Sequence, residues 1–181
     1  MKLICLLAFL SITLVINANQ LVNGVYKIKS ANFDRYWDTY HYGDTSNPDL
    51  YLEIPFSDNY QQFTLTCLSN GYYTITSVRF NRNVVAKKSA NPLETLFLAT
   101  PDSNDQNQQF SLVRRKDGAY LVTPRKICDK AVEAPLIARQ ELFLDKIECN
   151  SDLQYFFFNL VSSNPTAEFL SLDSVSSRPT D

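Results

Sequence analysis

The chain has 181 residues, with 17 basic and 19 acidic side chains and a formal charge of −2. This mild balance, without a concentrated run of one sign, does not indicate a nucleic-acid-binding surface. Tyr and Phe are abundant, with 10 and 12 copies, whereas Gly occurs 4 times. The composition favours a single globular domain whose core is packed with aromatic rings.

The first eighteen residues resemble a signal peptide. Lys2 precedes an uncharged apolar run from Leu3 to Val15, which suits a signal-peptide core and is shorter than the roughly 18 residues of a membrane span. We expect cleavage near Ala18, a secreted protein and no membrane span. A retained membrane anchor is the alternative.

A three-fold repeat follows and covers the chain to about residue 161. One phrase contains Gly24, Gly71 and Gly118, each 47 residues after the last. Two further phrases return in the same order with nearly the same period. The three sets are NGVYKI, NGYYTI and DGAYLV; LYL, LFL and LFL; and YQQFTLT, NQQFSLV and LQYFFFN. Such periodicity indicates three structural units.

Each unit is predicted to form short strands. The Asn-Gly and Asp-Gly pairs are turn signals followed by alternating apolar residues, and no window shows a helical stripe. We expect an all-β domain over residues 19–162, with about four strands in each unit of 22–68, 69–115 and 116–161. Closure into a barrel would remove exposed strand edges. Residues 163–181, rich in Ser, Thr and Pro, are expected to be a flexible tail.

The third phrase resembles the repeated Gln-x-aromatic phrase of the ricin B-type lectin family, with Phe in place of the usual Trp. The repeated residues are Gln61, Gln108 and Gln154 with Phe63, Phe110 and Phe156. The resemblance implies a β-trefoil and a non-catalytic protein that binds glycans or glycoproteins. It also implies a Cys128–Cys149 disulfide, since the family often joins cysteines at these places. Pairing of Cys67 with either is the alternative, and a Cys67-linked dimer is a further possibility.

The family's sugar sites combine an early aspartate, an aromatic ring after the central strand and an asparagine beside the repeated glutamine. Unit one supplies Asp38 and Gln61, and unit three supplies Asp129 and Gln154. Unit two has Asn107 and Gln108 in place, but Val85 stands at the aspartate position. The ring position holds Glu53, Ala99 and Asp145 in the three units. No unit carries the whole set, so the resemblance implies partly degraded sugar sites.

Unit one is the best candidate, because Trp37 and Tyr40 would supply an aromatic surface near Asp38. Trp37 alternates with Asp38 along a strand, so a place in the core is the alternative for this ring. The repeated glutamines are also candidates for sugar ligands, although a role in holding the fold together is the favoured explanation.

The sequence contains no convincing catalytic constellation. His41 is the single histidine, zinc-ligand spacing is absent, and no glycine-rich phosphate loop occurs. We therefore predict no catalytic residue, no metal and no cofactor. A secreted protease inhibitor using a loop at 41–49 or 100–107, or a structural or adhesion protein, remains the alternative to a lectin. The basic region around Arg114–Lys116 and Arg125–Lys126 suggests a site for an anionic partner or simply a solvated hairpin.

Overall fold

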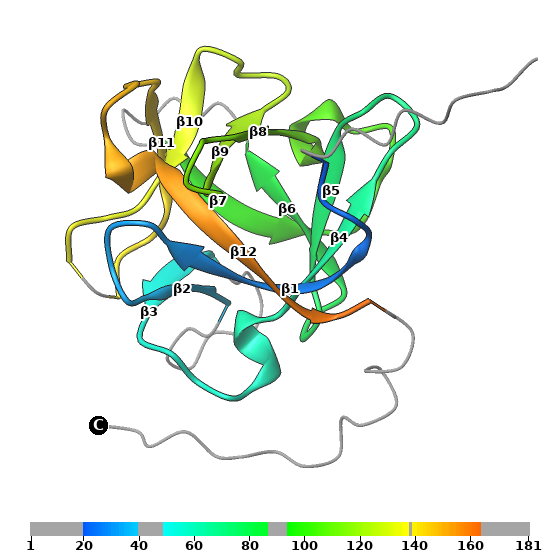
Figure 1. Ribbon diagram of the computed structural model, residues 1–181. Helices are drawn as coiled ribbons and strands as arrows, with labels where there is room; N and C mark the ends of the chain where they lie inside the picture. Colours follow the sequence, from blue (N-terminus) through cyan, green and yellow to red (C-terminus); the bar gives the residue numbers. More distant parts are fainter. Residues whose placement is uncertain (1–19, 40–48, 87–93, 138, 164–181) are drawn as a thin grey trace, which may run out of the picture.

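The computed structural model describes residues 20–39, 49–86, 94–137 and 139–163 (Figure 1). The predicted signal peptide, Tyr40, His41 and nearly all of the predicted tail lie outside these residues. Within the described ranges, no helix has the length and hydropathy needed to cross a membrane.

The described residues form an all-β fold with four strands in each of three units, as the repeats predict. Unit one contains β1 (Gly24–Ser30), β2 (Tyr36–Asp38), β3 (Tyr51–Glu53) and β4 (Phe63–Cys67). Unit two contains β5 (Tyr73–Ser77), β6 (Arg82–Ala86), β7 (Glu94–Ala99) and β8 (Phe110–Arg114). Unit three contains β9 (Tyr120–Pro124), β10 (Lys130–Glu133), β11 (Phe143–Lys146) and β12 (Tyr155–Ser162).

The first and last strands of the units close a barrel. Antiparallel pairs connect β1 to β4, β4 to β5, β5 to β8, β8 to β9, β9 to β12, and β12 back to β1. The middle strands pair as the hairpins β2–β3, β6–β7 and β10–β11. Figure 1 shows β12 and β1 crossing the front of the barrel and the β10–β11 hairpin beside it. Each unit therefore adds one two-strand piece of barrel and one hairpin.

The repeated aromatic residues form the centre of the core. Phe63, Phe110 and Phe156 are all buried, because each begins or nearly begins a barrel strand and points toward the barrel axis. The tyrosines of the first phrase, Tyr26, Tyr73 and Tyr120, are buried as well. Alternation along the strands sends every second side chain inward, so the repeated phrases encode a three-fold core.

The repeated glycine has two different roles. Gly71 and Gly118 adopt left-handed φ angles of 83° and 94° in turns, where a side chain would be strained. Gly24 lies under β12, and a Cβ atom there would come within 2.7 Å of the Ser162 carbonyl oxygen. The repeated glycine is therefore required by a turn in units two and three, and by the close approach of β12 in unit one.

Three 3₁₀ helices that the sequence patterns did not predict precede the last strand of each unit. They are η1 (Asn59–Gln61), η2 (Gln106–Gln108) and η3 (Asp152–Gln154). Asp58 and Asp105 cap the first two by accepting from backbone N–H groups inside the turn. Each helix ends on the repeated glutamine, and its turn directs that side chain under the neighbouring hairpin.

Candidate functional site

The repeated glutamine of unit one ties three segments together. Gln61 is fully buried, and its Nε2 donates to Asp38 Oδ2 at 2.9 Å and to the Ile54 carbonyl oxygen at 2.7 Å. Its Oε1 accepts from the Phe56 backbone N–H at 2.8 Å. The side chain therefore joins the end of β2, the loop after β3 and the start of β4.

Unit three repeats this network with a glutamate. The Nε2 of Gln154 donates to Glu133 Oε2 at 2.8 Å and to the Lys146 carbonyl oxygen at 2.7 Å. Its Oε1 accepts from the Glu148 backbone N–H at 2.9 Å. Units one and three thus each hold a carboxylate at the end of a hairpin's first strand by an amide hydrogen bond.

Unit two keeps the glutamine but has no carboxylate. Gln108 Nε2 donates to the Thr100 carbonyl oxygen at 3.0 Å, and its Oε1 accepts from the Asp102 N–H at 2.9 Å. The remaining partner is Asn83, whose Nδ2 donates to Gln108 Oε1 at 2.7 Å. Because the network persists without an acid, the glutamine acts in this unit as a support of the fold.

Strand register decides which residues are equivalent. Trp37, Val84 and Val132 pair with the three repeated leucines Leu52, Leu98 and Leu144. The residues one position later are therefore Asp38, Val85 and Glu133. The structure places Glu133, and not Asp129, at the aspartate position of unit three. Asp129 lies before β10, exposed to solvent. The prediction of Asp129 for this position was wrong, because the first strand of the hairpin, β10, begins only at Lys130.

The two carboxylates differ in exposure. Asp38 is 0% exposed, and Tyr51, which lies opposite it on β3, is buried. Glu133 and the opposite residue Phe143 are both only half-buried. Directly opposed residues of an antiparallel pair lie on one face with their Cβ atoms about 4.5–5.5 Å apart. Unit three therefore presents a carboxylate and an aromatic ring side by side at the surface.

Burial raises the pKa of the Glu133 carboxyl above its ordinary value, and the hydrogen bond from Gln154 opposes this effect. The negative charges of Asp145 and Glu148 raise this pKa further. The Glu133 site is thus electronegative, and its carboxylate has a strengthened tendency to accept hydrogen bonds or a proton.

The aromatic surface predicted in unit one is not formed by Trp37. This ring is 0% exposed and meets Phe63 and Phe156 edge-on, at centroid distances of 6.1 and 5.3 Å. Strand alternation places Asp38 on the opposite face from Trp37, so the tryptophan cannot stack on a ligand held by Asp38. Tyr40, the other predicted ring, lies outside the described residues.

Phe143 is an aromatic residue that the family pattern does not predict. The pattern places the ring after the LFL phrase, at Asp145, whereas the ring opposite Glu133 is the central residue of the phrase itself. Strand alternation gave a usable signal, because the two leucines of LFL point inward and the central residue must point outward.

The three cysteines of the described chain are free thiols, with Cys128 and Cys149 exposed. The predicted Cys128–Cys149 disulfide is not formed, although the two residues flank the open end of the β10–β11 hairpin, beyond the pair Lys130–Lys146. Cys67 is half-buried and accepts a hydrogen bond from Gln20 Nε2 at 2.8 Å. The structure gives no support to a dimer linked through it.

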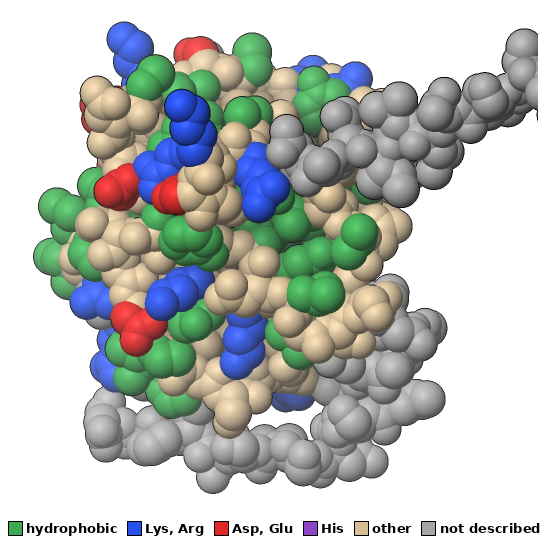
Figure 2. All heavy atoms as spheres, in the orientation of Figure 1, with side chains coloured by type: hydrophobic (Ala, Val, Ile, Leu, Met, Phe, Trp, Pro, Cys, Tyr) green, Lys and Arg blue, Asp and Glu red, His purple; other side chains and the backbone are tan. Residues whose placement is uncertain are grey.

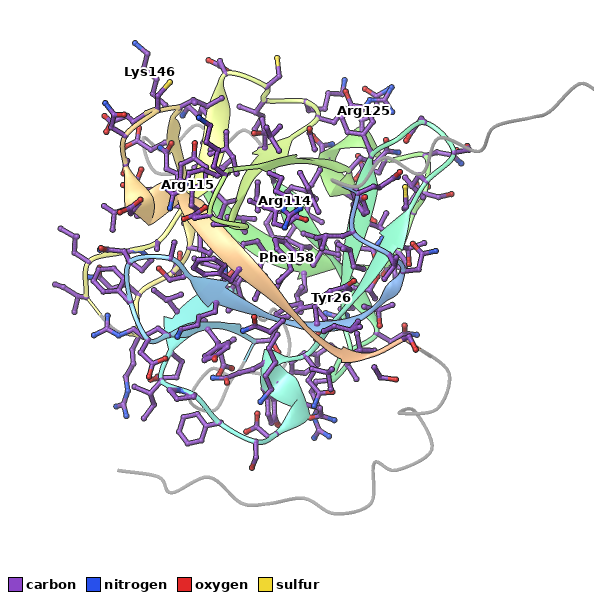
Figure 3. All side chains as sticks on the ribbon, in the orientation of Figure 1. Tyr26, Arg114, Arg115, Arg125, Lys146 and Phe158 are labelled. Carbon is purple, nitrogen blue, oxygen red and sulfur yellow. The ribbon has the colours of Figure 1, made fainter. Side chains whose placement is uncertain are left out.

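The basic region does not converge on one patch. Arg115 binds Asp117 and Asp152 and covers the Tyr155 ring at 4.1 Å. Arg125 donates to Gln109 Oε1 at 2.6 Å. In Figure 3 Arg114, Arg115 and Arg125 lie well apart on the face shown. The region is a set of structural contacts together with solvated side chains. No group of His, Cys, Asp and Glu residues suited to a metal ion occurs in the described ranges.

Residues 59–133 match the family model of the ricin-type β-trefoil lectin domain-like proteins. The domain is a β-trefoil similar to the ricin-type lectin domains. The designed three-fold symmetric protein ThreeFoil is 18% identical with a TM-score of 0.67, over 75% of this chain and 98% of its own. The Rhizoctonia solani agglutinin is 11% identical with a TM-score of 0.65, covering 78% and 97% of the two chains. The Macrolepiota procera ricin B-like lectin, in complex with lactose, is 12% identical with a TM-score of 0.64, covering 78% and 99%. Comparison with curated proteins found no significant match.

Proposed function

We propose that this β-trefoil is a secreted, non-catalytic carbohydrate-binding protein whose working site is in unit three. The observation that carries the proposal is the Glu133–Phe143 pair, held by Gln154 and half-buried at the surface. Its ligands are glycans or glycoproteins.

The chemistry of this pair suits a sugar. A pyranose ring presents hydroxyl donors at its edge and C–H groups on one face. The ionised Glu133 accepts hydrogen bonds from hydroxyls, and these are stronger than bonds between neutral groups. Phe143 offers its ring to the apolar sugar face. Gln154 fixes the carboxylate beforehand, so little side-chain freedom is lost when a sugar binds.

The other units supply less. In unit one Asp38 and Tyr51 occupy the corresponding positions, but both are buried. In unit two Phe97 lies opposite Val85, which has no hydrogen-bonding group. The proposal therefore assigns one open sugar site to the domain and gives unit two only an aromatic remnant.

The absence of catalysis is part of the proposal. The single histidine of the sequence and the lack of a nucleophile motif support it. The carboxylate of Glu133 lies beside an aromatic ring and accepts a hydrogen bond from Gln154, an arrangement suited to holding sugar hydroxyls. Glycoside turnover that disappears in Glu133→Gln would contradict this part.

A glycan array probed with the purified mature protein tests the binding proposal. We expect at least one glycan to bind, and Glu133→Gln and Phe143→Ala each to weaken that binding about tenfold or more. Phe97→Ala is the matched control, since it removes the equivalent ring of unit two and should leave binding unchanged. A blank array from verified folded protein, together with inhibition of a protease panel, would favour the inhibitor alternative.

A further inference from the structure

Three carboxylates lie close together at the proposed sugar site. Glu133 lies opposite Phe143, and Asp145 comes two residues later on β11, on the same outer face of the hairpin. Diagonal neighbours such as Glu133 and Asp145 are about 7–8 Å apart. The third carboxylate belongs to Glu148, whose backbone N–H donates to the same Gln154 amide that donates to Glu133. The ring of Phe143 therefore lies in an acidic environment.

These acids keep their charge available to a ligand. Asp145 accepts a hydrogen bond from the Lys146 backbone N–H, and Glu133 accepts one from Gln154 through its Oε2. The Oε1 atom of Glu133 accepts no hydrogen bond from the residues that the structure describes. Within the same described ranges, no ion pair includes Glu133, Asp145 or Glu148.

Basic side chains around the hairpin do not neutralise this site. Lys130 places its Nζ 3.2 Å from Glu94 Oε2, and Arg139 places its Nε 3.3 Å from Glu53 Oε2. Lys146 is exposed, but alternation along β11 directs its side chain to the face opposite the ring. Figure 3 shows Lys146 pointing outward at the edge of the molecule. The outer face of the hairpin therefore keeps its negative potential.

This negative potential is local. On the face that Figure 2 shows, acidic and basic side chains lie interspersed, and the whole chain carries a formal charge of only −2. The charges of Asp145 and Glu148 both act on Glu133, since they raise its pKa. No group of acids among the described residues is suited to a metal ion, so an organic cation is the better match for the site.

We propose that the site selects glycans with a protonated amino group, that is, hexosamine residues without an N-acetyl group. This inference rests on the proposed sugar site and names its ligand class. The ammonium group donates to Glu133 Oε1, while the C–H face of the sugar ring contacts Phe143. A hydrogen bond between two charged groups is about twice as strong as one between neutral groups, so the amine is preferred to a hydroxyl or an amide. Asp145 and Glu148 attract the cation over a longer range and repel carboxylated or sulfated glycans.

Titration calorimetry of the full mature protein with three matched tetrasaccharides tests this inference. They are an oligomer with free amines, its N-acetylated form and its N-sulfated form, prepared in the glucosamine and the galactosamine series. At about pH 6.5 amines are protonated and carboxyl groups are mostly ionised. In at least one series we expect the free amine to bind about tenfold more tightly than the N-acetylated form, and the N-sulfated form to bind most weakly.

The acids around the ring are tested by paired substitutions. The double variant Asp145→Asn, Glu148→Gln should reduce the preference for the amine over the N-acetylated form by about threefold, because the two charges act through solvent. The matched control is Asp34→Asn, Asp102→Asn, which removes two exposed acids elsewhere and changes the net charge equally. The control should keep the wild-type preference.

Equal affinity for the free and the N-acetylated amine, with binding lost in Glu133→Gln, would overturn this inference and leave the proposed sugar site standing. The same conclusion follows if array glycans bind through Glu133 and the free-amine tetrasaccharides do not bind. An equal loss of preference in both double variants would assign it to net charge and overturn the inference. A tetralysine peptide that binds as tightly as the amine would show that charge alone is recognised. Folded protein that binds no glycan at all would overturn the proposed function as well.

Discussion

Units one and three contain the same glutamine–carboxylate hydrogen-bond network but expose it to different degrees. In both, the repeated glutamine donates to a carboxylate at the end of the hairpin's first strand, and an aromatic residue lies opposite. Asp38 and Tyr51 are buried, whereas Glu133 and Phe143 are half-buried. The carboxylate of the same network is therefore fully buried in unit one and half-buried in unit three. Exposure, and not the set of residue types, distinguishes the two units.

The largest expected contrast concerns the aromatic rings. Trp37→Ala should lower the free energy of unfolding by about 3–5 kcal/mol, because it empties a fully buried position between two Phe rings. Phe143→Ala should cost only about 1 kcal/mol, since this ring is half-buried on the outer face. Urea denaturation measures both, and equal losses would contradict the distinction between closed and open units.

We expect a smaller difference in the free energy of unfolding between the two glutamine variants. Gln61→Ala should cost about 2–3 kcal/mol, because it removes the hydrogen bonds that this fully buried amide makes to the Asp38 carboxylate and to two backbone groups. Gln154→Ala should cost about 1–2 kcal/mol, since water can reach Glu133. Denaturation of the two variants at neutral pH provides the comparison. A larger loss for Gln154→Ala would show that unit three is not the more open one.

Glu133→Gln should raise stability at neutral pH. The folded-state pKa of Glu133 is raised by burial and by neighbouring acids, so ionisation of this group is harder in the folded protein than in the unfolded chain. Its unfavourable contribution is present above the folded pKa and disappears as the pH falls below the unfolded value. The substitution removes this contribution while keeping an acceptor for Gln154. Denaturation at about pH 4 and about pH 7 checks it, and a variant less stable than wild type at neutral pH would reverse the assignment.

The pKa shift of Asp117 has the opposite sign to that of Glu133, and we expect it to have the smallest effect on stability. Hydrogen bonds from Arg115 lower the pKa of its carboxyl from 3.8 to about 2. Its stabilising contribution is therefore present above the unfolded value and is lost as the pH falls through about 2. Asp117→Asn should flatten the acid limb of the stability curve and leave glycan binding unchanged. An unchanged acid limb would show that this exposed ion pair contributes nothing to stability.

The sequence predicts the fold well because the repeated phrases are core positions. Phe63, Phe110 and Phe156 recur for packing, and their spacing specifies three equivalent units. Equivalence across the hairpins was harder to predict. In unit three the sequence predicted Asp129 at the aspartate position. The pairing of β10 with β11 places Glu133 there instead. Pairing register depends on turns whose lengths differ between units, and no local pattern specifies them.

The solvent exposure of the two carboxylates could not be predicted from the sequence either. Asp38 and Glu133 have similar chemistry, but Asp38 is buried and Glu133 is half-buried, and the residue type alone does not specify this difference. Trp37 showed the same difficulty, because alternation left both a core and a surface reading possible until the pairing of β2 with β3 was known. The turns that aim the glutamines also escaped prediction, since a three-residue 3₁₀ helix leaves no periodicity.

An NMR titration of the labelled protein with the best glycan from the array tests the central claim most directly. Backbone amide shifts should change around Glu133, Phe143 and Gln154, and should stay unchanged around Asp38 and Gln61. Changes that cluster at Asp38 and Gln61 instead would show that unit one holds the site and would contradict the account.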